Sequence, residues 1–276
     1  MLDFFKAVVL GLLQGLTEFL PISSSAHLRI FPELFGWGDP GAAFTAVVQI
    51  GTELAVLIYF RKDIWRIGHA WVRALYDPSW RGREDARMGW FVIVGSLPIV
   101  VLGILLQDVI ESDFRSLWII GTTLIVLGVV LGIADRVGRN ERAMRQLTWQ
   151  HAVLMGFAQA AALIPGVSRS GATISMGRFL HYEREAATRF AFLLAIPAVV
   201  GAGIFQLGDI PDGDNAYGPV PTLVATVVAF VVGYAAIAWL LRYVSTRSYL
   251  PFVVYRILLG AGTLVLTAAG VLAAGG

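Results

Sequence analysis

The stretch LIPGVSRSGAT, residues 163–173, places an arginine, two serines and a threonine behind a Pro-Gly break in the middle of a very apolar chain. A charged side chain at the depth of a bilayer costs roughly 2.5–3.5 kcal/mol, so this stretch needs a specific reason to exist. An earlier stretch, GLLQGLTEFLPISSSAHL at 11–28, aligns to 156–173 without gaps. The matching pairs are Gly11 with Gly156, Gln14 with Gln159, Ser23 with Ser168 and Ser25 with Ser170. The two stretches indicate an internal repeat built around two broken helices.

The composition is typical of an integral membrane protein. Of 276 residues, 57% are hydrophobic and 14% are charged, and the mean hydropathy is +0.72, whereas soluble domains usually carry about 25% charged residues. A helix needs about 20 apolar residues to cross a bilayer. Six continuous apolar runs come close to that length: 44–60, 89–107, 117–134, 189–205, 222–241 and 252–272. Because a backbone in lipid must satisfy its own hydrogen bonds, the runs predict an all-α polytopic membrane domain over 1–276, with six transmembrane helices.

Two shorter apolar stretches, 7–20 and 152–164, end at the serine clusters of the repeat. Each is too short to cross a bilayer alone and is followed by a second short helical stretch. Each therefore predicts a re-entrant helix hairpin that is broken at membrane depth.

The loop charges predict the orientation. Three loops are rich in arginine, namely 61–88, 135–148 and 242–250, and two are poor in positive charge, namely 108–116 and 206–221. The positive-inside rule places the basic loops in the cytoplasm. The two hairpins then enter from opposite faces, which gives an inverted-topology repeat with halves of about 1–134 and 135–276. Repeats of this kind build a shared site near the midplane from broken helices.

The serine clusters SSSAHL and SRSGAT each look like the start of a short helix. A helix N-terminus offers unpaired N–H groups and a partial positive charge, so two that meet would bind an anion. Arg169 adds a guanidinium fork that suits phosphate. The alternative for Arg169 is a structural pair with a buried carboxylate, and the alternative for the serines is capping and helix–helix hydrogen bonding.

Groups suited to acid–base or metal chemistry lie in the first half. Gln14 and Glu18 share one helix face, and Glu18 at membrane depth must be protonated, paired or joined by a cation. Mg²⁺ typically binds one or two carboxylates plus substrate phosphates, so Glu18 is a candidate metal ligand or general base. His27 is a candidate acid–base group, or an activator of Ser24 or Ser25, with helix packing as its alternative. Without cysteine, no thiolate site is available.

Other polar residues leave two interpretations open. Glu53, with Gln49 on the same helix face, is either a second site carboxylate or a structural partner for Arg169 or Arg256. A charged cluster near the end of the second hairpin is expected to be interfacial, with snorkelling side chains. Its members are Arg178, His181, Glu183, Arg184, Glu185 and Arg189.

The segments QGLTEFLPISSSAH (14–27) and PGVSRSGAT (165–173) together resemble the undecaprenyl pyrophosphate phosphatase family of the bacitracin-resistance type. The resemblance covers essentially the whole chain. It implies a hydrolase of the bacterial plasma membrane that removes the terminal phosphate of undecaprenyl pyrophosphate. The product, undecaprenyl phosphate, is reused as the lipid carrier of peptidoglycan synthesis. The resemblance also implies a divalent cation, Mg²⁺ or Ca²⁺, and a site that faces the outside.

The family's motifs assign roles to individual positions. The resemblance implies a metal site at Gln14 and Glu18, where the glutamine leaves Glu18 as the one carboxylate of that motif. The implied catalytic residues are Glu18, Ser24, His27 and Arg169. The implied phosphate-binding residues are Ser23, Ser25, Ser168, Arg169, Ser170 and Thr173. Either Ser24 or a water molecule is the nucleophile, and the sequence does not choose between them.

A carrier is the rival function, because transporters also build anion sites from inverted repeats with broken helices. A carrier needs binding groups but no acid–base pair, so Glu18 with His27 favours the enzyme. The expected partners are the lipid substrate and membrane lipids. No nucleic acid is expected, and a homodimer stays open.

Overall fold

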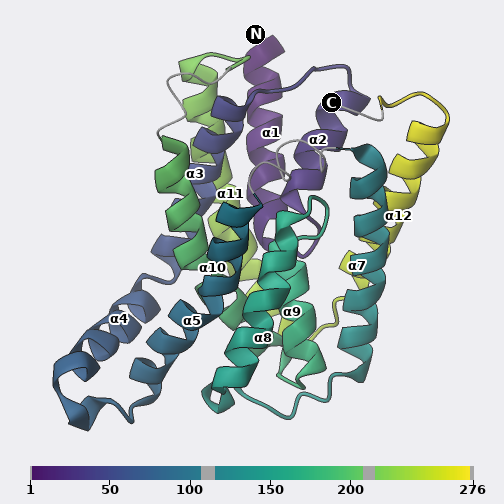
Figure 1. The fold of residues 1–276 in the computed structure, drawn as a ribbon. Helices are drawn as coiled ribbons and strands as arrows, with labels where there is room; N and C mark the ends of the chain where they lie inside the picture. Colours follow the sequence, from purple (N-terminus) through teal and green to yellow (C-terminus); the bar gives the residue numbers. More distant parts are fainter. Residues whose placement is uncertain (1, 107–115, 208–214, 274–276) are drawn as a thin grey trace.

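The computed structural model describes residues 2–106, 116–207 and 215–273, and within these ranges the regular structure is helical (Figure 1). The described α-helices are α1 (Leu2–Phe19), α2 (Ser24–Leu34), α3 (Ala42–Tyr59), α4 (Arg61–Tyr76), α5 (Glu84–Leu105), α7 (Leu117–Val137), α8 (Trp149–Ala160), α9 (Arg169–Phe179), α10 (Arg184–Leu207), α11 (Pro219–Val244) and α12 (Leu250–Ala268). Three short 3₁₀ turns lie at Pro78–Trp80, Met144–Gln146 and Ala161–Leu163.

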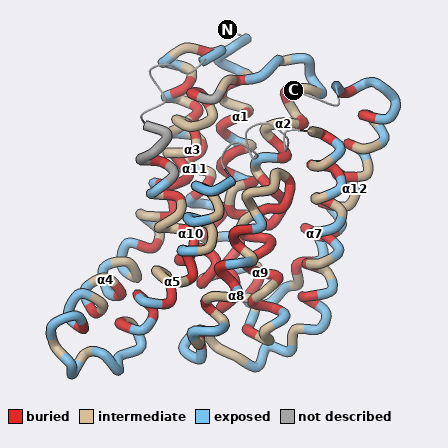
Figure 2. The backbone as a smooth tube through the Cα atoms, viewed as in Figure 1, coloured by how far each residue is buried: buried red, intermediate tan, exposed pale blue. Residues whose placement is uncertain are grey.

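Among the described helices, α5, α7, α11 and α12 are each long and apolar enough to cross a membrane. A fifth span results if α3 and α4, which meet at an angle of 69°, count as one. Buried residues lie inside the bundle and exposed residues cover its outside (Figure 2). That outside is apolar along the long helices, since Ile104 of α5 is 73% exposed and Leu258 of α12 is 67% exposed. The chain is therefore a multi-pass membrane protein.

The six predicted spans all fall on helices, with small differences at their ends. The run 189–205 lies inside α10, and 252–272 ends earlier, at Ala268, before a turn in which Gly270 adopts a positive φ of 72°. Residue 107, the last of another run, lies outside the described residues, as does most of the predicted loop 108–116 and part of the loop 206–221.

The prediction of a loop at 61–88 was wrong, because helix α4 and the start of α5 occupy most of it. Ala70 and Ala74 of α4 pack against Ala86 of α5. The basic residues of α4 alternate with these small apolar ones at helical spacing, so the segment forms a helix that buries one face and exposes its charges.

The two broken stretches form helix hairpins that point toward each other from opposite ends of the bundle (Figure 1). The α1–α2 hairpin doubles back so that Phe5, near the start of α1, contacts Trp37, just after α2, with ring centroids 6.5 Å apart. The α8–α9 hairpin doubles back at the other end, where His151 Nδ1 lies 2.8 Å from the Tyr182 hydroxyl. Both turns therefore lie inside the molecule.

The first helix of each hairpin packs on a long apolar helix through the same repeat position. Gly11 of α1 lies against the Ala225 carbonyl of α11, and Gly156 of α8 lies against the Gly95 carbonyl of α5. A Cβ at either glycine would overlap that carbonyl oxygen. These close approaches are typical of helix packing in membranes, and they occur in equivalent places in both halves.

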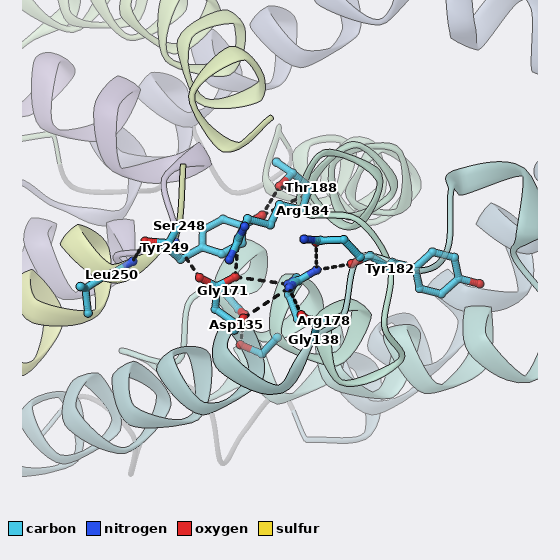
Figure 3. Close-up of polar contacts among 12 residues, drawn as sticks. Asp135, Gly138, Gly171, Arg178, Tyr182, Arg184, Thr188, Ser248, Tyr249 and Leu250 are labelled. Atoms are coloured by element: carbon cyan, nitrogen blue, oxygen red, sulfur yellow. Dashed lines mark hydrogen bonds and ion pairs between the residues drawn. The ribbon is translucent and has the colours of Figure 1, made fainter. Parts of the chain in front are cut away.

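An arginine-rich end of the bundle, which we call the basic end, gathers the α3–α4, α7–α8, α9–α10 and α11–α12 connections. Arg189 at the start of α10 pairs with Asp63 of α4 at 2.6 Å. Asp135, near the end of α7, accepts from Arg184 Nε at 2.6 Å and from the Tyr249 N–H at 3.0 Å (Figure 3). The charged connections of both halves therefore lie on one side.

The expectation that Arg178 snorkels at an interface was wrong, because its side chain is fully buried. Figure 3 shows its guanidinium inside the Asp135 cluster, where it lies 3.3 Å from the carboxylate. It also donates to the Gly138 carbonyl at 2.7 Å and to Asn140 Oδ1 at 2.6 Å. A carboxylate and several oxygen acceptors replace the water that this guanidinium loses on burial, so the buried charge is compensated.

Candidate active site

The two short helices that follow the breaks start in the same way. Ser23 caps α2 and Ser168 caps α9, and both adopt positive φ angles, 74° and 69°. Each hydroxyl accepts from the backbone N–H three residues later, that of Ala26 at 3.4 Å and that of Gly171 at 3.2 Å. A positive φ is rare for serine and persists only when the surroundings hold it. Both halves therefore use the same strained turn to place a helix N-terminus at the centre of the molecule.

The tips of the two hairpins contact each other directly. Ser170 donates to the Leu20 carbonyl at 3.2 Å, and the Gly166 N–H donates to Ser25 Oγ at 3.4 Å. Ser25 also shares a hydrogen bond with Ser23 at 3.1 Å. The structure thus brings together the two serine clusters, which lie about half the chain apart in the sequence.

Glu18 lies where the two tips meet and accepts from both halves. Its Oε1 pairs with Arg169, and its Oε2 accepts from Ser24 at 2.7 Å and from Gln14 at 3.2 Å. Gln14 also donates to Thr52 of α3 at 3.3 Å. Of the states open to a carboxylate at this depth, the structure shows the paired one, and Arg169 forms an ion pair with a largely buried carboxylate.

This ion pair lines a small, partly open pocket with a cavity volume of about 20 Å³. Its polar lining is Glu18, Thr52, Glu53, Arg169 and Ser170. The remaining lining is apolar and comes from α1, α3 and α10: Phe19, Val56, Ala191, Phe192, Ala195 and Val199. A pocket with one polar and one apolar wall suits an amphiphilic ligand with a charged head.

Glu53 enters the same pocket from α3 and is 8% exposed. Gln49, one turn earlier, donates to its Oε1 at 3.4 Å. Arg256 is not its partner, since that guanidinium bonds only to backbone carbonyls among the described residues. Glu53 therefore lies in the same pocket as the Glu18–Arg169 pair, and its role there stays a prediction.

His27 is almost fully buried and does not line the pocket. Its Nδ1–H donates to the Ser23 carbonyl at 2.6 Å, and its Nε2 lies 2.6 Å from the Tyr255 hydroxyl. The rings of His27 and Tyr255 stack at 5.5 Å. Both ring nitrogens are therefore occupied, and the Ser24 hydroxyl is directed to Glu18 instead.

Thr173, a predicted phosphate-binding residue, is fully buried one turn into α9 and lies outside the pocket lining. Its hydroxyl donates to the Arg169 carbonyl at 2.9 Å. Its predicted role stays a prediction, as do the catalytic roles of His27 and Ser24.

Three residues at this centre escaped the sequence analysis as members of a site: Thr52, Tyr255 and Arg256. Each is a polar residue inside an apolar helix, which is a signal in itself. Thr52 precedes Glu53, and Tyr255 and Arg256 are neighbours on α12. What the sequence lacks is any indication that α12 reaches the hairpin tips.

The pocket offers oxygen donors for a metal ion. In the described part of the chain, no group of three or more His, Cys, Asp and Glu residues is placed to hold one. Glu18 and Glu53, the two carboxylates that line the pocket, are oxygen donors that suit Mg²⁺ or Ca²⁺ rather than a metal preferring nitrogen or sulfur, while Gln14 lies outside the lining and contacts Glu18. Two carboxylates fit a cation that takes its remaining ligands from water or from a bound anion.

Comparisons with known proteins place the chain in a family. Residues 7–262 match the family model described as bacitracin resistance protein BacA. A Nocardioides protein named undecaprenyl-diphosphatase is 74% identical over 99% of this chain and 100% of its own length. Undecaprenyl-diphosphatase 2 of Streptomyces coelicolor is 57% identical over 98% of this chain and 97% of its own. Undecaprenyl-diphosphatase of Micrococcus luteus is 57% identical over 99% of this chain and 100% of its own.

Proposed function

The chain belongs to the family of the bacitracin resistance protein BacA, and from this we propose that it is an undecaprenyl-diphosphatase. The reaction hydrolyses undecaprenyl pyrophosphate to undecaprenyl phosphate and phosphate, which recycles the lipid carrier of peptidoglycan synthesis and confers bacitracin resistance. One observation carries the proposal: the Glu18–Arg169 pair lies in a half-apolar pocket between two serine-capped helix N-termini. Identities of 57–74% with relatives of that name support it.

The pocket suggests how the substrate binds. The diphosphate lies against Arg169, Ser170 and the N-termini of α2 and α9, and the polyprenyl chain follows the apolar wall of α3 and α10. Arg169 exchanges the Glu18 carboxylate for the terminal phosphate, to which it makes charge-assisted bonds. The same exchange releases Glu18 for chemistry, so the ion pair acts as a resting state that only an anionic ligand opens.

Glu18 is the base within reach of a nucleophile. Ser24 already donates its hydroxyl proton to Glu18 at 2.7 Å. In the covalent route, Ser24 Oγ bonds to the terminal phosphorus as its proton passes to Glu18 and the bond to the bridging oxygen breaks. Water then hydrolyses the phosphoserine. In the direct route, Glu18 takes the proton from an attacking water molecule. His27 can join either route only after its bonds to Ser23 and Tyr255 are released.

We include Mg²⁺ or Ca²⁺ in the proposal because the donor set fits. Glu18 and Glu53 would hold the cation together with phosphate oxygens, with Gln14 as a further oxygen donor. The bound cation would neutralise the charge that develops on the phosphate oxygens.

The membrane arrangement is proposed on the same footing. Helices α3, α5, α7, α10, α11 and α12 are the six spans, and α1–α2 and α8–α9 are re-entrant hairpins of an inverted repeat with halves of about 1–134 and 135–276. The clustering of arginine-rich connections at the basic end supports a cytoplasmic position for that end. The protein then lies in the bacterial plasma membrane with its pocket open to the outer side.

The test is phosphate release from undecaprenyl pyrophosphate by the purified chain in detergent. We expect release with Mg²⁺, none with EDTA, and loss of release in Arg169→Ala. Arg139→Ala is the matched control, because Arg139 is an exposed arginine in the α7–α8 connection and should leave turnover unchanged. A protein that binds the lipid but releases no phosphate would instead be a carrier, and the pocket would be a binding site only.

A further inference from the structure

Arg256, in the middle of α12, is a fully buried cation that the proposed chemistry does not use. Its guanidinium donates to five backbone carbonyls, two of them on α7 (Thr123 at 3.5 Å and Leu124 at 3.3 Å). The other three belong to the hairpin tips: Pro21 at 3.2 Å, Gly166 at 3.0 Å and Val167 at 3.0 Å. One side chain thus bonds to both broken turns.

The bonded carbonyls lie directly before the strained caps. Pro21 stands two residues before Ser23, and Gly166 and Val167 immediately precede Ser168. A serine keeps a positive φ only where its surroundings fix the backbone. Arg256 supplies such contacts to both turns at once, so it links the positions of the two helix N-termini.

The charge of Arg256 is not neutralised by a carboxylate. Carbonyl dipoles satisfy its N–H groups, but among the described residues no Asp or Glu pairs with it. Arg178 differs, since it is equally buried but pairs with Asp135. A net positive charge also lies close to the first turn of α9, where a Cβ on Gly171 would be 2.8 Å from Arg256 Nη1. Burial of an unpaired charge is costly, and an anion nearby lowers that cost.

We propose that Arg256 is a positioning residue that fixes both phosphate-binding turns through their carbonyls, and that its unneutralised charge raises the affinity of the pocket for a diphosphate. The inference rests on the proposed function for the identity of the anion. Arg256 makes two contributions to the site: its five hydrogen bonds fix the geometry of the turns, and its charge attracts the anion. Different substitutions of Arg256 remove each contribution.

The experiment compares Arg256→Lys and Arg256→Met with Arg178→Lys as the matched buried control, all in the full-length chain in detergent. Three quantities are measured: binding of inorganic pyrophosphate by calorimetry, kcat and KM for undecaprenyl pyrophosphate, and thermal unfolding. Lysine keeps the charge but cannot reach both turns, so Arg256→Lys should lower kcat about tenfold or more while pyrophosphate affinity changes little. Arg256→Met should also weaken pyrophosphate binding by about tenfold or more.

Arg178→Lys should lower thermal stability and leave pyrophosphate binding, kcat and KM of the folded protein unchanged. If folded Arg256→Met binds pyrophosphate as wild type does and keeps kcat and KM, the inference is wrong. If that variant does not fold, Arg256→Lys decides, and a lysine variant that loses only thermal stability overturns the positioning role. A wild-type protein that binds pyrophosphate without turnover refutes the phosphatase alone, and the binding data still test the charge of Arg256.

Discussion

The two hairpin tips share one backbone design but carry different chemistry. Ser23 and Ser168 form matching strained caps, yet the first tip contributes the carboxylate Glu18 and the second contributes the cation Arg169. At the position that matches Glu18, the second copy has Leu163. A repeated scaffold therefore presents two helix N-termini, and the difference between the copies gives a carboxylate to one tip and a guanidinium to the other, where the two groups pair.

The two glutamines at matching repeat positions, Gln14 and Gln159, differ in their hydrogen bonding. Gln14 bonds to Glu18 and Thr52, whereas its counterpart Gln159 is fully buried and, among the residues that the structure describes, neither of its side-chain polar atoms has a partner. A buried unsatisfied amide is destabilising, so Gln159 is expected to cost stability where Gln14 contributes it.

The largest effect is expected from breaking the contact between the tips. Glu18→Gln and Arg169→Ala should each lower turnover by about 10³-fold or more, the range known for a phosphate-clamping arginine. Because the two side chains touch, the double variant should lose much less than the product of the single losses. Phosphate release by the three variants measures this coupling, and fully multiplicative losses would show that the two tips act independently.

The next largest effect is expected at Ser24 in the first tip, and it distinguishes Ser24 from water as the nucleophile. Ser24→Ala removes the hydroxyl bonded to Glu18 and should lower turnover by about 10²–10⁴-fold, the contribution of a positioned acid–base contact. Mass spectrometry of quenched wild-type reactions should detect phosphate on Ser24 if the covalent route operates. Near-normal turnover of Ser24→Ala would rule out that route and leave water as the nucleophile.

A smaller effect is expected where α12 supports the first tip. Tyr255→Phe removes one hydrogen bond to His27 and should lower kcat by about two- to tenfold, the worth of a neutral hydrogen bond. Tyr234→Phe on α11 is the control, since no side-chain hydrogen bond of Tyr234 is found in the described structure. An unchanged kcat in Tyr255→Phe would indicate that the His27–Tyr255 pair contributes packing alone.

The smallest effect on activity is expected at Gln159, where substitution should change stability in the opposite direction to substitution of Gln14. Gln159→Leu removes an unsatisfied amide and should stabilise the protein by about 1 kcal/mol, with turnover unchanged. Gln14→Leu removes two bonded contacts and should lower both stability and turnover. Thermal unfolding in detergent together with phosphate release checks the pair, and destabilisation by Gln159→Leu would mean that its amide has a function.

Much of the fold follows from local sequence, because apolar runs in lipid have few alternatives to a helix. The six runs fall on helices with small differences at their ends, and the helices break near both predicted places. The loop prediction at α4 failed because its arginines hid a helical spacing of small residues. The snorkelling prediction for Arg178 failed because Asp135, on another helix, provides its partner.

By itself the sequence determined the two breaks, their serine caps and most of the polar residues that line the pocket, Thr52 being the exception. These features depend on helix propensity, capping and spacing within about twenty residues. Only the tertiary structure decided which groups meet. The Glu18–Arg169 pair, the entry of Glu53 into the pocket and the reach of Arg256 to both tips join residues far apart in the chain. Such contacts depend on how the helices cross and how closely the glycines let them approach. Neither property can be inferred from residue type and local spacing alone.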